Sequence, residues 1–218
     1  MKYRSVFDII GPVMIGPSSS HTAGAARIGR AARSLFGRKP RRVTVTLYGS
    51  FAKTYRGHGT DIAIVGGILN FDTDDERIVH SLEIAREEGV EVTFVESEEV
   101  PEHPNTARLH LEDEEGEIEV VGISVGGGKM ELVELNGFEL RLSGNAPALL
   151  VTHVDRYGAV AKVAGVLANH RINIGYMQVS RKERGSEALM IIETDQAVSD
   201  SLRKELSELT DITGVTIL

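Results

Sequence analysis

The spacing of apolar, polar and breaking residues predicts an α+β arrangement for roughly the first 140 residues. An Ala/Gly-rich run between a serine cluster and Gly37 is typical of a helix, because serine caps a helix start and glycine a helix end. An alternating run of β-branched residues is typical of a strand. On these criteria we expect helices over residues 20–36, 61–69 and 75–88, and strands over residues 43–48 and 90–95.

The final part of the chain follows a regular order of strands and helices. Its first predicted helix carries apolar residues at helical spacing, namely Val160, Val163, Val166 and Leu167. Strands are expected over residues 148–154, 172–179, 188–193 and 215–218, and helices over residues 159–169 and 199–209. The resulting order is βαββαβ, which is the order of a ferredoxin-like fold.

A polar segment of small residues separates these two parts. Residues 142–147 read Leu-Ser-Gly-Asn-Ala-Pro, a composition typical of linkers. We therefore expect two domains, over residues 1–143 and 147–218.

Composition narrows the classes of function. The formal net charge of −8 argues against a nucleic-acid partner. No run of about 18 apolar residues occurs, so we expect no membrane partner. No apolar stretch follows residues 1–5, so we expect no signal peptide and a cytoplasmic location. The chain has no cysteine, so any iron–sulfur cluster in the functional unit needs cysteines from another polypeptide.

A cluster of small polar side chains lies at the start of the first predicted helix. It consists of Ser18, Ser19, Ser20, His21 and Thr22. A helix N-terminus has unpaired N–H groups and a partial positive charge, so added hydroxyls suit a carboxylate or a phosphate. His21 can transfer a proton near neutral pH. The alternative is a redundant helix cap with His21 at the surface, although capping needs only one serine.

A second polar segment follows the first predicted strand. Residues 49–61 contain hydroxyls, flexible glycines, Lys53 and His58, and end at Thr60 and Asp61. We expect a loop that contacts a substrate or a partner. The alternative is an ordinary loop in which Thr60 or Asp61 caps the next helix.

The junction between the first strand and the first helix of the βαββαβ part is a third candidate site. His153, Asp155 and Gly158 lie in it, and Asn173 follows the helix. A small zwitterion can place its carboxylate on the helix N–H groups and its ammonium on Asp155. The alternative is a tight connection without a ligand.

The chain resembles the β chain of iron–sulfur-dependent L-serine dehydratases. The resemblance is carried by Gly-Pro-Ser-Ser-Ser-His-Thr-x-Gly at residues 16–24, by His-Gly-Thr-Asp at residues 58–61, and by the βαββαβ tail. It covers essentially the whole chain. It implies an N-terminal allosteric-substrate-binding-type α/β domain and a C-terminal ferredoxin-like ACT domain, a common sensor of amino acids.

The resemblance implies a lyase, an L-serine ammonia-lyase that converts L-serine to pyruvate and ammonia. A [4Fe–4S] cluster bound by a separate α chain would activate the serine hydroxyl, so this chain would bind no cofactor and would be inactive alone. Ser19, Ser20, His21 and Thr22 match the family motif that faces the cluster-bearing domain. We expect them to complete the active site, with His21 orienting the substrate or relaying a proton.

The tail resembles the ACT domain of phosphoglycerate dehydrogenase, which binds L-serine. His153, Arg156, Gly158 and Asn173 match its effector-site pattern, whereas Asp155 takes the place of an asparagine. We expect L-serine or another small amino acid to bind there, and we expect the ACT domains to pair into a homodimer.

Two other functions fit parts of the sequence. A stand-alone amino-acid sensor would use the tail to regulate some other enzyme. A cofactor-free hydrolase would use Ser20 as nucleophile and His21 as base. Adjacent residues rarely present such groups to one another, however, and no third orienting residue is evident.

Overall fold

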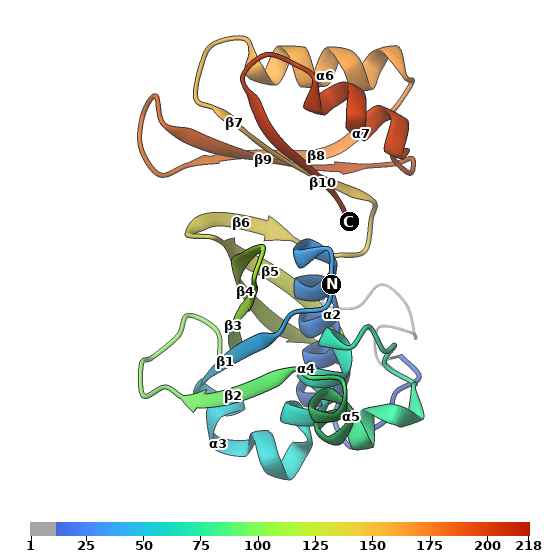
Figure 1. Ribbon diagram of the computed structural model, residues 1–218, viewed down its shortest axis with the longest axis vertical. Helices are drawn as coiled ribbons and strands as arrows, with labels where there is room; N and C mark the ends of the chain where they lie inside the picture. The colour runs from blue at the N-terminus through green and yellow to red at the C-terminus, as the bar shows by residue number, and fades with distance from the viewer. Residues whose placement is uncertain (1–11) are drawn as a thin grey trace, which may run out of the picture. The chain divides into compact units, whose positions relative to one another are not determined.

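The computed structural model describes residues 12–218, and the chain divides into two compact units, Met1–Asn136 and Gly137–Leu218 (Figure 1). The start of the chain, where the sequence predicts no signal peptide, lies outside the described residues. Among the residues that are described, no helix is both long enough and apolar enough to cross a bilayer. The division falls shortly before the predicted boundary, so that strand β6 (Phe138–Leu142) groups with the second unit.

Unit 1 combines short helices with a mixed sheet, as the sequence predicts. Its helices are η1 (Ser19–Ala23), α2 (Gly24–Phe36), α3 (Gly49–His58), α4 (Thr60–Ile68), η2 (Glu76–His80) and α5 (Ser81–Glu87). Its strands are β1 (Arg42–Tyr48), β2 (Glu91–Glu96), β3 (Asn105–Asp113), β4 (Gly116–Gly126) and β5 (Lys129–Leu135). Within this unit the strand order is β2-β1-β3-β4-β5. The β1–β2 pair is parallel, and the β1–β3, β3–β4 and β4–β5 pairs are antiparallel.

Strand β1 shows how the sequence pattern places the core. Val43, Val45 and Leu47 are buried, and the residues between them are exposed or half-buried, because alternate side chains of a strand point to opposite faces. Helix α2 packs against β3, β4 and β5, and α3 packs against β1 and β3. The end of β1 and the start of α2 thereby lie close to α3 and α4 (Figure 1).

Helices α2 and α4 pack with their backbones in contact. A Cβ atom on Gly67 would lie 2.0 Å from the carbonyl oxygen of Ala26, and one on Gly29 would lie 2.2 Å from the carbonyl oxygen of Ile64. Real side chains do not reach such distances, so only glycine fits at either position. The glycines that weaken both helices therefore allow the two helices to approach closely.

The segment 49–61, expected to be a loop, is mainly the helix α3, so this expectation is wrong. The buried residues Phe51, Ala52 and Tyr55 lie on one face of α3 and pack it onto the sheet. The start of α3 is held by the carbonyl oxygen of Pro104, which accepts from the backbone N–H of Ser50 at 2.7 Å. Tertiary packing, which local composition does not reveal, makes this polar segment helical.

The other expected helices of unit 1 are present with changed ends. The first begins as a π-helical turn, η1, before it continues as α2, and it ends at Gly37 with φ 77°. The helix expected over residues 75–88 is split into the 3₁₀ turn η2 and α5, and Asp75 caps η2.

Unit 2 confirms the βαββαβ order and the ferredoxin-like arrangement. Its elements after β6 are β7 (Ala148–Val154), α6 (Ala159–Asn169), β8 (Ile174–Arg181), β9 (Glu187–Thr194), α7 (Asp200–Ser207) and β10 (Ile212–Ile217). The four-stranded sheet has the order β10-β7-β9-β8. Its core includes Leu149 and Val151 of β7, Val163 and Leu167 of α6, and Leu206 of α7, which are all fully buried.

We expect Gly67→Ala to lower the free energy of unfolding by about 3 kcal/mol, because the new methyl group meets backbone atoms of α2 that cannot move aside. The matched control is Gly57→Ala in α3, where a Cβ atom would meet nothing within 4 Å. The control should be neutral or stabilising by about 0.5–1 kcal/mol. Urea unfolding followed by circular dichroism measures both. Equal stability of the two variants would contradict the close helix contact.

Candidate functional site

The motif of residues 18–22 is folded into the turn η1. Ser18 is the extended N-cap residue, and its Oγ accepts a hydrogen bond from the backbone N–H of His21 at 3.2 Å. Ser19 opens the turn, and its carbonyl oxygen accepts from the N–H of Gly24. The cap explains Ser18, whose Oγ also lies 3.5 Å from Nδ1 of His21.

Both ring nitrogens of His21 lie beside serine hydroxyls. Its Nδ1 is 3.0 Å from Ser20 Oγ, and its Nε2 is 3.0 Å from Ser50 Oγ at the start of α3. The ring packs edge-on against Phe51, at a centroid distance of 5.3 Å, and against His58, at 4.9 Å. Hydrogen bonds and ring contacts together fix the half-buried imidazole from several sides.

The surroundings of His21 favour the neutral form of its imidazole. Burial, followed by the nearby charge of His58, lowers the pKa of His21 below its ordinary value of 6.5. A neutral imidazole has one nitrogen that accepts a proton and one that donates it. At neutral pH His21 is therefore able to take up a proton from one side and release it on the other.

Thr22 links this turn to the junction of α3 and α4. Its side chain is buried, and its Oγ1 donates to the carbonyl oxygen of His58 at 3.2 Å. Gly16 packs directly onto Thr22, because a Cβ atom at its φ of 115° would lie 2.4 Å from the threonine methyl group. Thr60, at the start of α4, is fully buried, and its hydroxyl has no partner among the described residues.

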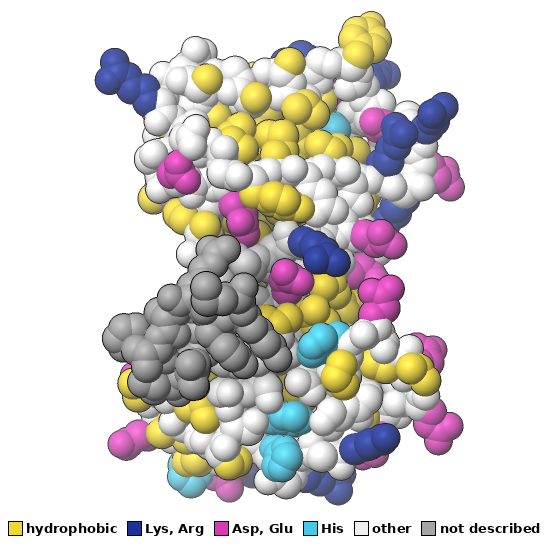
Figure 2. Space-filling model, turned by 180° about the vertical axis from the view of Figure 1, so that it is seen from behind, with side chains coloured by type: hydrophobic (Ala, Val, Ile, Leu, Met, Phe, Trp, Pro, Cys, Tyr) yellow, Lys and Arg dark blue, Asp and Glu magenta, His cyan; other side chains and the backbone are white. Residues whose placement is uncertain are grey.

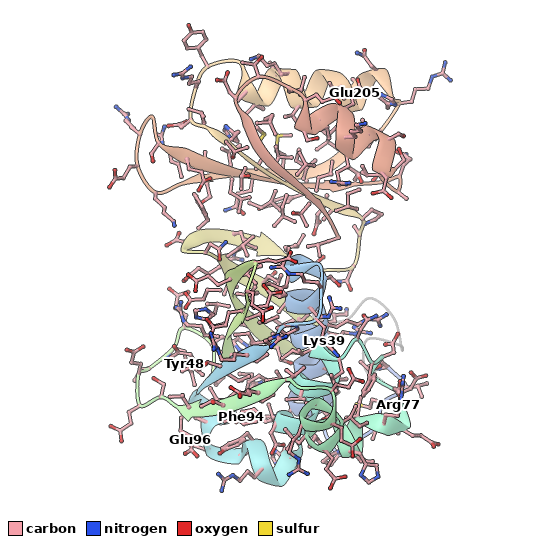
Figure 3. All side chains as sticks on the ribbon, in the orientation of Figure 1. Lys39, Tyr48, Arg77, Phe94, Glu96 and Glu205 are labelled. Atoms are coloured by element: carbon pink, nitrogen blue, oxygen red, sulfur yellow. The ribbon has the colours of Figure 1, made fainter. Side chains whose placement is uncertain are left out.

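Lys53 and Asp61 lie at the edge of this cluster. Lys53 is exposed on α3 and lines a hollow of about 430 Å³ with Arg56, His58 and Glu96. Figure 3 shows Glu96 and Phe94 on β2 beside α3, where Phe94 stacks on Tyr55 at 5.7 Å. Several histidine side chains gather on one face of unit 1 in Figure 2.

Asp61 is the half-buried acid of this edge. Its Oδ1 accepts from the N–H of Ile62 at 2.9 Å, and burial raises its pKa above the ordinary value. The segment at residues 49–61 thus lies beside the cluster around His21 and is helical.

Sequence reasoning missed Ser50 and the contact that supports it. Ser50 lies 29 positions from His21, and nothing in the sequence distinguishes it from the other hydroxyl residues of its segment. The turn at residues 103–105 supports Ser50 through the Pro104 carbonyl oxygen. Within this turn, His103 Nδ1 accepts from the N–H of Asn105 at 3.2 Å. Only the Pro-Asn pair signals a turn there, and it does not say what the turn contacts.

The structure also corrects one argument about Ser20. Adjacent residues were expected not to present a hydroxyl and an imidazole to one another, yet Ser20 Oγ lies 3.0 Å from His21 Nδ1. Both residues lie in the π-helical turn η1. The other ring nitrogen faces the hydroxyl of Ser50, whereas a hydrolytic triad has a carboxylate that orients the imidazole.

The site's donor set does not fit an iron–sulfur cluster. Such clusters are held by cysteine thiolates, and this site consists of hydroxyls and imidazoles in a chain without cysteine.

On the β3–β4 hairpin, away from this site, possible metal-ligand atoms of His110, Glu112 and Glu117 lie within 4.8 Å of one another. Arg42 already donates to Glu112 there at 2.5 Å.

The expected effector residues of unit 2 form separate contacts. His153 is 2% exposed, and its Nδ1 donates to the carbonyl oxygen of Val154 at 2.8 Å. Gly158 takes a φ of 88° at the start of α6, which glycine adopts readily. Asn173 donates to Asp195 at 2.7 Å.

The carboxylate of Asp155 already has partners within unit 2. Its carboxylate accepts from the N–H of Gly185 at 3.0 Å and from Arg181 at 3.1 Å, and these bonds lower its pKa. An ammonium group would have to compete with Arg181 for this carboxylate.

Comparison with known proteins gives matches along the whole chain. Residues 5–88 match the family model described as "Serine dehydratase beta chain", and residues 148–211 match the ACT domain model. The "Probable L-serine dehydratase, beta chain" of Bacillus subtilis is 63% identical over 99% of this chain and 98% of the relative. The "L-serine dehydratase, beta chain" of Peptoniphilus asaccharolyticus is 36% identical over 93% of this chain and 92% of the relative.

A more distant match concerns another enzyme. A D-3-phosphoglycerate dehydrogenase of Bacillus subtilis is 27% identical over 81% of this chain, which corresponds to 34% of that relative. Both units of the chain thus resemble part of a longer protein.

We expect His58→Ala to raise the pKa of His21, because it removes the neighbouring positive charge. The pKa should stay below 6.5, since burial is the larger cause of the shift. An NMR titration of the ring protons measures it, with His80→Ala, an exposed histidine of η2, as the control. An unchanged pKa in His58→Ala would show that the two rings do not interact electrostatically.

Proposed function

The chain belongs to the L-serine dehydratase β-chain family and carries a C-terminal ACT domain, and we propose that it is the β subunit of an enzyme that converts L-serine to pyruvate and ammonia. The observation that carries the proposal is the assembly of His21 with Ser20, Ser50 and His58 in a chain that matches β chains from end to end. The subunit would complete the active site of an α chain.

The residues present indicate which parts of the reaction this chain and the α chain would each carry out. Elimination of water from L-serine requires removal of the α-proton and loss of the β-hydroxyl, after which the enamine hydrolyses to pyruvate and ammonia. The resemblance assigns a [4Fe–4S] cluster to the α chain, where it would act as Lewis acid on the substrate hydroxyl. This chain contributes hydroxyls and a neutral imidazole instead, and these groups orient the substrate and move protons.

Each residue of the site has a proposed task. Ser19, Ser20 and Thr22 lie in the turn η1 at the start of a helix, where the partial positive charge favours the substrate carboxylate. His21 exchanges the proton. Thr22 holds the turn against the end of α3. Ser18, Lys53, His58, Thr60 and Asp61 form the surrounding rim, toward the substrate or the α chain.

We propose that unit 2 senses a small amino acid, L-serine among the candidates. His153, Asp155, Gly158 and Asn173 surround the start of α6 or follow its end, as the family pattern implies. Binding of an ammonium group at Asp155 would displace Arg181. The edge strand β8, with Tyr176 40% exposed and Val179 45% exposed, supports pairing with a second ACT domain.

The experiment is an anaerobic co-purification from the native cells. The chain should bring down a cysteine-containing polypeptide, and the complex should contain iron and form pyruvate from L-serine. The chain alone should form none. A partner without iron and without pyruvate formation would favour the alternative, a regulatory module that senses amino acids.

We expect His21→Ala to lower the turnover of the assembled enzyme at least tenfold, which corresponds to about 1.4 kcal/mol of barrier. Proton transfer by the imidazole is then lost, whereas binding of the α chain is retained. Steady-state kinetics with L-serine measure the effect, and His80→Ala serves as the control. Unchanged turnover in His21→Ala would remove His21 from the reaction.

A further inference from the structure

The partners of His21 differ from those of two other histidines in the chain. In His103, Nδ1 accepts from a backbone N–H, so in the neutral ring the proton must lie on Nε2. In His153, Nδ1 donates to a backbone carbonyl oxygen, so the proton must lie on Nδ1. Each of these contacts fixes one tautomer, because the backbone group can only donate or only accept.

His21 is not fixed in this way. Ser20 Oγ and Ser50 Oγ are both hydroxyls, and a hydroxyl donates or accepts according to its rotation. The ring proton can lie on Nδ1, with Ser50 donating to Nε2, or on Nε2, with Ser20 donating to Nδ1. Both states use the same heavy-atom positions, so the change between them requires hydroxyl rotation and no movement of the ring.

The hydroxyls continue beyond the ring on one side. Ser20 Oγ lies 3.3 Å from Ser18 Oγ, and Ser18 follows the exposed residues Gly16 and Pro17. On the other side, Ser50 precedes the fully buried Phe51, and its backbone is held by Pro104. Ser18 and Ser50, which are both half-buried, form the two ends of this row of groups.

We propose that Ser50, His21, Ser20 and Ser18 form a proton relay, in which Ser50 is the positioning residue that connects His21 to the reacting centre. The proposal rests on the proposed function and names a residue and a route within its site. Ser50 acts through His21, since its hydroxyl can hold Nε2 in either tautomer of the ring.

One proton passes through the relay without leaving a charge behind. A proton that arrives at Ser50 Oγ releases the original hydroxyl proton to Nε2 of His21. The proton on Nδ1 moves to Ser20 Oγ, the Ser20 proton moves to Ser18 Oγ, and the Ser18 proton passes to water. Every group is neutral before and after the transfer. The lowered pKa of His21 suits this role, because the ring does not remain charged.

The first test uses the full chain without an α chain. In 15N NMR of the histidine rings, we expect wild-type His21 to populate both tautomers. Ser50→Ala should move the proton to Nδ1, where Ser20 still accepts it. Ser20→Ala, made together with Ser18→Ala because Ser18 Oγ also lies 3.5 Å from Nδ1, should move it to Nε2, where Ser50 accepts it. Ser50→Thr keeps the hydroxyl and should retain both tautomers, and Ser34→Ala, at an exposed position of α2, is the control.

These spectra decide the relay whether or not the enzyme is active. A single tautomer in the wild-type chain, or a shift of Ser50→Ala and Ser20→Ala in the same direction, would overturn the proposal. Circular dichroism establishes that each variant is folded. If Ser50→Ala or Ser20→Ala does not fold, the tautomer shift expected for the remaining variant still supports the relay. The absence of that shift contradicts the relay.

The second test uses the complex with the α chain. We expect Ser50→Ala to lower kcat about 100-fold, within the range that a positioned proton-transfer group contributes. KM should change little, and Ser50→Thr should restore most of the rate. In mixtures of H2O and D2O, the rate of the wild-type enzyme should depend on more than one proton, and this dependence should be lost in Ser50→Ala. A larger effect on KM than on kcat would make Ser50 a binding residue and overturn the relay.

An inactive complex with the expected tautomers would contradict the proposed function and leave the hydroxyl network established. An active complex in which Ser50→Ala has unchanged kcat would contradict the relay and leave the proposed function established.

Discussion

The backbone contact between α2 and α4 determines where the candidate site forms. His21 lies in the turn that leads into α2, and His58 lies in the residues that lead into α4. Because Gly29 and Gly67 let the two helix backbones touch, the starts of both helices lie near one another, and Thr22 joins them by a hydrogen bond to the His58 carbonyl oxygen. A larger residue at either glycine would separate the helices and move the two imidazoles apart.

The chemistry of the site depends on the groups that hold His21, which within residues 12–218 are hydroxyls and not carboxylates. A carboxylate beside His21 would stabilise the imidazolium form, whereas the hydroxyls of Ser20 and Ser50 serve the neutral ring equally well. Burial and the neighbouring His58 act in the same direction. The same arrangement separates this site from a hydrolytic triad, in which a carboxylate holds the imidazole.

Sequence patterns predicted the elements whose apolar positions repeat regularly and missed those that depend on distant contacts. Strand β7 and helix α6 have the predicted bounds because their apolar residues follow strand and helix periods. Helix α3 was missed because its three buried positions lie among many polar residues. Its start also depends on a hydrogen bond to Pro104, which is distant in the sequence. The serine and histidine cluster could be found from its composition. Ser50 could not, because only the folded chain brings it to His21.

The contact between α2 and α4 also bears on how such a site could be transferred to another scaffold. Each helix supplies the backbone surface against which the partner's glycine packs. The smallest portable unit is therefore the helix pair with the first turn of α3, which supplies Ser50. A graft of the serine–histidine motif alone would carry the side chains without the geometry that makes them work together.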